Sequence, residues 1–202
     1  MKTGRADTRR LPAVLLVCLL LVTATGCRSA GPRLSAAELK ALMERNRQAQ
    51  ELFQQALAAG ADPKRQEDLY RQAIGLVHDL GKAHNNLGLL LLGQERYEEA
   101  MPELREAVKE LPESAEPRFN LGYAYELIGR LPEAEDEYAG AVRLSPQEPD
   151  YLESLARVYI KRQASLGRAR SLLERALAHE VRPDNVAWIH KQLEALQMGP
   201  IP

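Results

Sequence analysis

The sequence predicts an all-α protein whose helices are arranged as a repeat array. The segment around Leu87-Gly88 returns 34 residues later at Leu121-Gly122, and the two copies align without a gap. Small residues keep fixed offsets in both copies, with Ala100 matching Ala134. Aromatic residues make up only 5% of the 202 residues, which favours helices packed through small contacts. A period of this length with small residues at fixed positions is typical of stacked helix pairs.

Residues 1–26 have the pattern of a signal peptide. Four basic residues precede an apolar run: Lys2, Arg5, Arg9 and Arg10. The run itself, Leu11–Val22, has 12 residues, whereas a helix that spans a bilayer needs about 20. The alternative is a transmembrane anchor, and the short run favours a signal that is removed instead.

The end of this signal, Ala24-Thr25-Gly26-Cys27, resembles a bacterial lipobox, although Ala24 stands where leucine is usual. The resemblance implies cleavage before Cys27 and lipidation of that cysteine, so residues 27–34 would form a lipidated tether. The alternative is ordinary signal cleavage that leaves Cys27 as a free thiol. Arg28 follows the cysteine, which by resemblance to Gram-negative lipoproteins implies the outer membrane, with the protein facing the periplasm. Acyl chains would hold the protein at the membrane.

The helical part is expected to span residues 35–198. Ser35 and Glu38 have the spacing of a capping box, which predicts a helix over 36–59 that stops at Gly60-Ala61-Asp62-Pro63. A second helix is expected over 64–77. The net charge of −1 gives no reason to expect a nucleic-acid partner.

Residues 81–114 and 115–148 resemble two tetratricopeptide repeats. The resemblance rests on eight positions in each unit: Leu87, Gly88, Leu91, Tyr97, Ala100, Leu104, Ala107 and Pro112, then Leu121, Gly122, Tyr125, Leu131, Ala134, Tyr138, Ala141 and Pro146. It implies antiparallel helix pairs stacked into a right-handed superhelix. The small residues would let helices approach closely, and the prolines would end the second helices.

The flanking units match this pattern less well. Residues 47–80 form a degenerate repeat in which Ala56 takes the small position after a two-residue shift, which predicts a shorter link between its helices. Residues 149–183 form another, with a longer link near 163–167. Residues 184–198 are expected to form a capping helix with one apolar stripe, because an array needs a last element with one buried and one exposed face.

In tetratricopeptide-repeat proteins the first helices of the pairs usually line the ligand groove. The resemblance therefore predicts twelve exposed groove positions: Asn85, Asn86, Leu89, Leu92, Phe119, Asn120, Tyr123, Glu126, Glu153, Ser154, Arg157 and Lys161. Seven of them are the predicted partner-binding residues: Asn85, Asn86, Leu89, Phe119, Asn120, Tyr123 and Arg157.

Two features of this predicted groove have alternatives. Asn86 and Asn120 match an amide ladder that binds an extended peptide in some members, because an amide both donates and accepts hydrogen bonds; alternatively, asparagine is simply common there. Leu89, Phe119 and Tyr123 form either an exposed apolar pocket or a packing contact with a neighbouring repeat or with a docked helix of the same chain.

The leading functional hypothesis is a membrane-anchored scaffold that binds a protein or an extended peptide in the cell envelope. In outline the chain resembles lipoproteins that help assemble pili and those that recruit cell-wall enzymes. A cell-wall or peptide hydrolase is the rival, but no nucleophile, phosphate loop or His-Glu-x-x-His pattern is present. No catalytic, cofactor-binding or metal-binding residue, and no small-molecule substrate, is therefore predicted. A structural spacer within an envelope complex is the third alternative.

Overall fold

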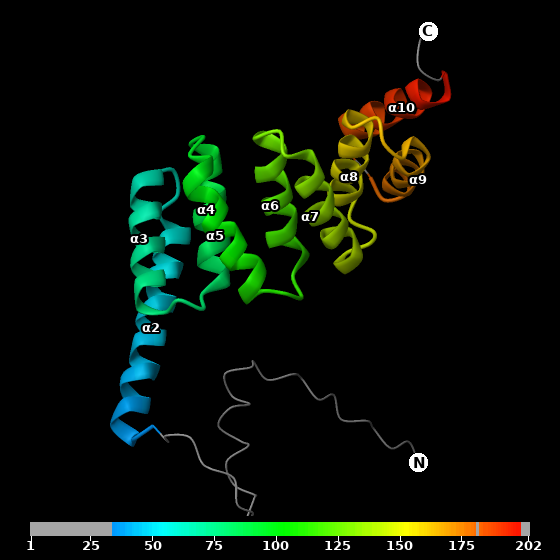
Figure 1. Cartoon of the computed structure of the whole chain (residues 1–202). Helices are drawn as coiled ribbons and strands as arrows, with labels where there is room; N and C mark the ends of the chain where they lie inside the picture. Colours follow the sequence, from blue (N-terminus) through cyan, green and yellow to red (C-terminus); the bar gives the residue numbers. More distant parts are fainter. Residues whose placement is uncertain (1–33, 181, 199–202) are drawn as a thin grey trace, which may run out of the picture. The chain divides into compact units, whose positions relative to one another are not determined.

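The computed structural model describes residues 34–180 and 182–198, which form nine α-helices and no strand (Figure 1). The predicted signal peptide 1–26, the predicted lipidation site Cys27 and residues 27–33 of the tether lie outside the described residues. In the part of the chain that is described, every helix is too short or too polar to cross a membrane.

The helices follow one another with short links, and their bounds match the sequence predictions closely. They are α2 (Ala36–Ala58), α3 (Pro63–Leu76), α4 (Gly81–Gly93), α5 (Tyr97–Glu110), α6 (Ala115–Leu127), α7 (Leu131–Leu144), α8 (Pro149–Lys161), α9 (Leu166–Leu177) and α10 (Pro183–Met198). The chain divides into two compact units, residues 1–39 and 40–202. The array of helix pairs belongs to the second unit.

The predicted capping box is present at the start of α2. The Ser35 hydroxyl accepts a hydrogen bond of 3.2 Å from the Glu38 backbone N–H, and the Ser35 backbone N–H donates to the Glu38 carboxylate at 2.7 Å. Each residue thereby satisfies a backbone donor that the helix itself leaves unpaired.

In residues 40–202, α4 packs against α5, α6 against α7, and α8 against α9, which confirms the predicted stack of helix pairs. The glycines explain how closely the helices of a pair approach. A Cβ atom on Gly88 would lie 2.6 Å from Leu104, and one on Gly122 would lie 2.7 Å from Tyr138. Neither separation leaves room for a methyl group, so these two positions require glycine.

The first pair, α2 and α3, departs from the regular repeat in a way the sequence did not predict. Ala56 is fully buried, as expected from the two-residue shift, and Phe53 packs on Tyr70 with ring centroids 5.9 Å apart. The expected shorter link is wrong, because residues 59–62 connect these helices whereas only 94–96 connect α4 and α5. Instead α2 ends at Ala58, two residues after the buried Ala56, and this early end absorbs the shift.

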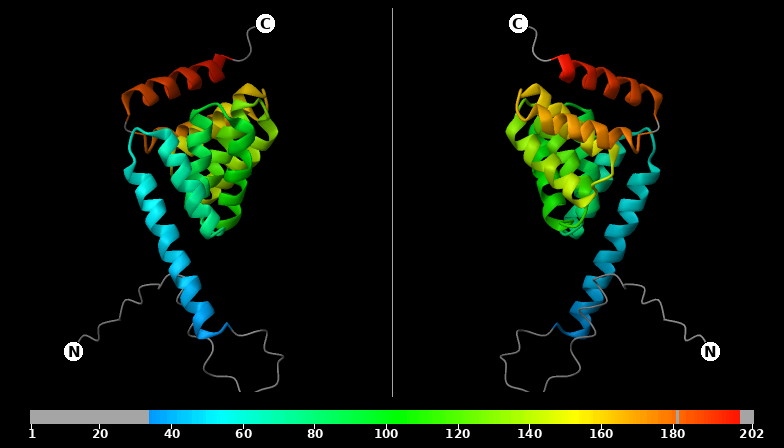
Figure 2. Two further views of the ribbon diagram at one scale, coloured as in Figure 1. Left: turned by 90° about the vertical axis from the view of Figure 1, so that its left-hand side faces the viewer. Right: turned by 90° about the vertical axis from the view of Figure 1, so that its right-hand side faces the viewer.

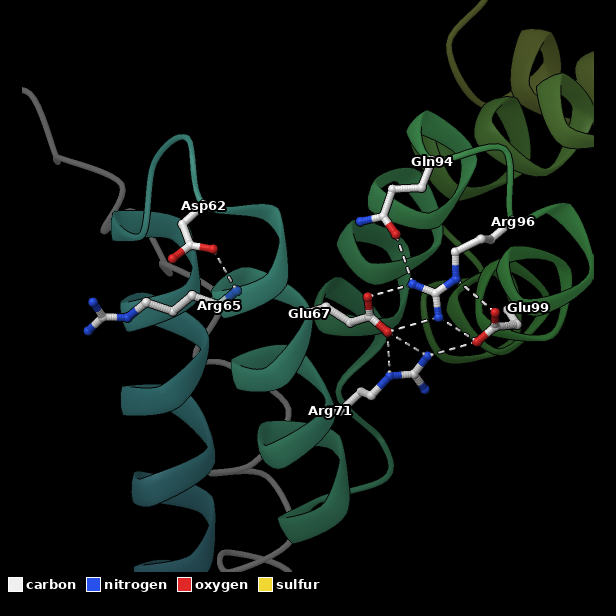
Figure 3. A network of polar contacts seen from close by, with 7 residues as sticks. All are labelled: Asp62, Arg65, Glu67, Arg71, Gln94, Arg96 and Glu99. Atoms are coloured by element: carbon white, nitrogen blue, oxygen red, sulfur yellow. Dashed lines mark hydrogen bonds and ion pairs between the residues drawn. The ribbon is translucent and has the colours of Figure 1, made fainter.

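Charged side chains join this first pair to the regular repeats (Figure 3). The Arg96 guanidinium, at the start of α5, lies 2.6 Å from Glu67 of α3 and 2.7 Å from Glu99 of α5. Arg71 of α3 lies 3.0 Å from Glu67 and 3.2 Å from Glu99. Two cations and two carboxylates thus alternate across the α3–α5 contact, which makes this a network instead of an isolated pair.

The last pair and α10 close the described array. Residues 162–165 link α8 to α9 and are one longer than the α6–α7 link, 128–130, which confirms the predicted insertion. Pro183 is the first residue of α10, where its missing N–H costs nothing, so it does not end α9. Ile189 is fully buried, and the Arg170 guanidinium donates to the Leu196 carbonyl at 2.7 Å. Both views of Figure 2 show α10 lying across the end of the neighbouring pair.

Candidate partner-binding groove

Buried amides connect the first helices of the two regular repeats. The Asn120 amide of α6 donates to the side-chain oxygen of Asn85 of α4 at 2.8 Å, and the Asn85 amide donates to the Glu116 carboxylate at 3.1 Å. Asn85 is 3% exposed and Asn120 is 5% exposed. The prediction that these two side chains are exposed in the groove is therefore wrong, because each is covered and paired by the neighbouring helix.

Asn86 has a different environment from Asn85. It is half-buried, its amide donates to the Tyr70 hydroxyl at 3.3 Å, and it lines a cavity of about 430 Å³. The cavity lies where α2, α4 and α6 meet, and its walls combine apolar, amide and charged side chains: Phe53, Gln54, Leu57, Lys82, Asn85, Asn86, Leu111, Ser114, Glu116 and Pro117. Its volume lies within the usual range for ligand sites, about 300–1,000 Å³.

Leu89 and Tyr123 are exposed, as predicted. They occupy equivalent positions of α4 and α6, one repeat apart, with exposed fractions of 37% and 42%. Leu89 follows Asn86 by three residues and therefore shares its side of α4. The exposed pair thus continues the surface that begins at the cavity.

Phe119 does not join this exposed pair. Its ring packs against Tyr138 of α7 with centroids 5.5 Å apart and against Tyr151 of α8 with centroids 4.8 Å apart. The contact joins one repeat to the next, so the predicted pocket of three apolar side chains is reduced to Leu89 and Tyr123. For Phe119 the alternative of packing against the neighbouring repeat is the one the structure shows.

Arg157 and Lys161 of α8 reach back to Glu126 of α6. The Glu126 carboxylate lies 2.9 Å from the Arg157 Nε and 2.7 Å from the Lys161 Nζ, and it accepts a 2.9 Å hydrogen bond from the Tyr138 hydroxyl. Burial by itself raises the pKa of Glu126, but the hydrogen bonds from Arg157 and Lys161 outweigh it and lower the pKa to about 2. Arg157, predicted to bind a partner, is therefore a positioning contact between repeats.

The remaining predicted groove positions are covered by the array itself. Leu92, Glu153 and Ser154 are buried, with exposed fractions of 5%, 7% and 4%, so their predicted exposure is wrong. Ser154 accepts a hydrogen bond of 3.0 Å from Arg157. Of the predicted binding residues, Leu89 and Tyr123 are exposed, whereas Asn86, Phe119 and Arg157 are half-buried and the last two are held by contacts between repeats.

Two features of this region were not predicted from the sequence. The first is the α2 wall of the cavity, formed by Phe53, Gln54 and Leu57, because the weak match of the first repeat left its register undefined. The second is the role of Glu126, whose partners Arg157 and Lys161 follow it by 31 and 35 residues. A search for opposite charges separated by about one repeat would have found that contact.

Comparison with known proteins agrees with the fold. Residues 85–149 match the tetratricopeptide repeat family. The chain is also similar to tetratricopeptide repeat-containing protein trd-1 of Caenorhabditis elegans, with 30% identity over 139 residues. The match covers 68% of this chain but spans only 18% of the length of that relative.

Solved structures show the same arrangement of helices. YrrB, described as a TPR protein with an unusual peptide-binding site, superposes with a TM-score of 0.56 at 22% identity, over 64% of this chain and 66% of that one. PilF of Pseudomonas aeruginosa superposes with a TM-score of 0.62 at 22% identity, over 75% of this chain and 78% of that one. Residues 85–149 therefore contain tetratricopeptide repeats, and the helix pairs of the chain share the fold of these solved structures.

Proposed function

We propose that this protein is a membrane-anchored scaffold that binds an extended segment of a protein partner in the bacterial envelope. The observation that carries the proposal is the exposed pair Leu89 and Tyr123, which continues from the cavity lined by Asn86. Exposed aromatic and aliphatic side chains beside a pocket are common anchors of protein interfaces.

The chemistry of this surface indicates the kind of segment that fits it. Phe53, Leu57 and Pro117 give the cavity apolar walls, while Gln54 and Asn86 bring amides that donate to and accept from a peptide backbone. Its two charged side chains, Lys82 and Glu116, have opposite signs. The surface therefore suits an extended segment with apolar side chains and little net charge.

The proposed location depends on the N-terminal sequence. Lipidation at Cys27, in a segment that resembles a lipobox, would tether the array to the outer membrane and expose it to the periplasm. A tether from Cys27 to Leu34 extends at most about 3.5 Å per residue, so the partner would be held close to the membrane. We propose assembly of an envelope structure such as a pilus or secretion system as the process served.

Affinity purification from envelope extracts tests the groove. The test variant combines Leu89→Ser with Tyr123→Ser, and the control is Leu144→Ser at the end of α7. Leu144 has the same exposed fraction as Leu89, 37%, but lies on a second helix. We expect the double variant to lose its partner and the control to retain it, with unchanged helicity in both. Equal capture by all three proteins would contradict a groove function and would favour a structural spacer.

A further inference from the structure

Three carboxylates meet where α8 contacts the start of α10. Asp150 lies in the first turn of α8, Glu153 follows one turn later, and Glu180 stands shortly before α10. One oxygen from each lies within 4.8 Å of the others. Glu153 and Glu180 are buried and Asp150 is half-buried.

The positive charge at this cluster comes from Arg182. Its Nη2 atom lies 2.5 Å from Asp150 Oδ1 and 2.5 Å from Glu180 Oε2. The Asn185 amide of α10 contacts Glu153 Oε2 at 3.4 Å and Glu180 Oε2 at 3.2 Å. One guanidinium thus faces three acidic side chains. Half of the Arg182 side chain is exposed, so it can turn towards solvent without unpacking a helix.

One carboxylate oxygen of the cluster is buried without a hydrogen-bond donor in the described part of the chain. Glu153 Oε1 is buried and accepts no hydrogen bond from the described residues. Burial, then a side-chain hydrogen bond with Glu180 and the charges of Glu180 and Asp150, raise the pKa of Glu153 to about 7. A buried acceptor without a donor costs about 1–3 kcal/mol. The favourable interaction of acidic residues with the N-terminus of a helix does not account for a buried oxygen of this kind.

We propose that Asp150, Glu153 and Glu180 bind a divalent cation, with Ca²⁺ the ion that fits best. Carboxylate oxygens are the ligands that hard cations prefer. Ca²⁺ binds six to eight oxygens at about 2.3–2.6 Å, so its ligand oxygens lie at most about 5 Å apart, and the three carboxylate oxygens meet that limit. Mg²⁺ usually keeps several waters and binds through one or two carboxylates, so a site with three carboxylates suits it less. Arg182 occupies the place of the cation and turns outward when the ion binds.

The site has a consequence for the array that is independent of partner binding in the groove. Asp150 and Glu153 belong to α8, while Glu180 lies in the link between α9 and α10, three residues before Pro183. A bound ion would therefore hold the last helix on the preceding pair. Ca²⁺ would raise the melting temperature and slow hydrogen exchange in α10, because a ligand that binds only the folded state stabilises it.

Calcium titration of the whole chain, purified in detergent, tests the proposal by calorimetry. Tb³⁺ serves as a luminescent probe, because a nearby excited tryptophan transfers energy to a bound Tb³⁺ ion. Trp188 on α10 is the one tryptophan of the sequence and lies one turn from Asn185. We expect saturable Ca²⁺ binding with Kd no weaker than about 1 mM, and Tb³⁺ emission excited through Trp188 that Ca²⁺ displaces.

Three variants separate an ion site from a merely acidic cluster. Glu153→Gln should weaken Ca²⁺ binding about tenfold or more, while Arg182→Ala should strengthen it, because the competing guanidinium is gone. Glu98→Gln, an exposed carboxylate at the start of α5, is the matched control and should bind as the wild type does. Circular dichroism checks that each variant is folded.

The proposal is overturned if the wild type binds no Ca²⁺ at millimolar concentrations. It is also overturned if Glu153→Gln and Glu98→Gln have equal effects, or if Arg182→Ala weakens binding as Glu153→Gln does. Each of these outcomes would leave the cluster as an ion-pair network that fixes α10 through Arg182.

Discussion

The Asn120 side chain donates a 2.8 Å hydrogen bond to the Asn85 side chain, across the contact between α6 and α4. Both residues are buried, and the Asn85 amide in turn donates a hydrogen bond to the Glu116 carboxylate. These two amides are thereby used between repeats and are not available to a ligand. Binding is left to the exposed neighbours of these residues, and the buried amides fix how α4 and α6 meet.

Asn120→Ala should therefore destabilise the array instead of removing a ligand contact. It leaves the Asn85 oxygen without its donor in a buried position, which costs about 1–3 kcal/mol. Urea denaturation measures the change in the free energy of unfolding. Asn86→Ala, which removes a half-buried side chain, is the control and should cost less. An unchanged midpoint for Asn120→Ala together with lost partner binding would restore the ladder hypothesis.

Gly122→Ala should destabilise the second regular pair, because the new methyl group would lie 2.7 Å from Tyr138. Overpacking of a core contact costs about 1–3 kcal/mol. Gly75→Ala on α3 is the control, since nothing lies within 4 Å of its added Cβ atom. That change should stabilise the protein by up to about 1 kcal/mol. Thermal melts of the two variants that shift in the same direction would show that the Gly122 contact is looser than described.

Acid should weaken the contact between α6 and α8 through Glu126. Its pKa in the folded protein, about 2, lies below the ordinary value of 4.5. The ionised carboxylate therefore stabilises the fold above about pH 4.5, and this contribution is lost as the pH falls through 4.5 towards 2. Glu126→Gln should lower stability at pH 7 by about 2 kcal/mol, with a difference from wild type that shrinks in acid.

Urea denaturation of both proteins at pH 7 and pH 3 measures this difference. Glu133→Gln is the control, because its partner Arg130 lies on the exposed surface and such pairs contribute at most about 1 kcal/mol. A difference between wild type and Glu126→Gln that is constant from pH 7 to pH 3 would exclude ionisation of Glu126 as the cause.

Cys27→Ser should release the protein from membranes without changing its fold. The substitution removes the sulfur that the lipobox-like segment offers for acylation, and it lies outside the compact unit 40–202. Fractionation of cells into membrane pellet and soluble extract measures the effect. Cys18→Ser, at the other cysteine of the chain, should stay in the pellet because that residue would be discarded with the signal. Retention of Cys27→Ser in the pellet would argue against lipidation.

The sequence by itself determined the helix pairs and their packing seams. Gly88 and Gly122 could be interpreted correctly because a small residue at a fixed repeat position has one physical use, which is to let two helices touch. Pro112 and Pro146 marked the ends of α5 and α7 for an equally local reason, since proline removes a helix donor. The capping box at Ser35 depended only on residues three apart, so it too was visible.

Only the tertiary structure decided which side chains of the first helices are accessible. Asn86 and Asn120 occupy equivalent repeat positions, yet one lines a cavity and the other is buried against α4. Glu153, expected in the groove, lies instead beside Glu180 and Asn185, near the start of α10. Exposure depends on what the neighbouring helix places over a residue, and α2 ends early while α10 crosses the end of its neighbouring pair. The repeat period specifies which position of a helix pair each residue occupies, whereas the burial of that residue depends on the side chains that the neighbouring repeat places against it.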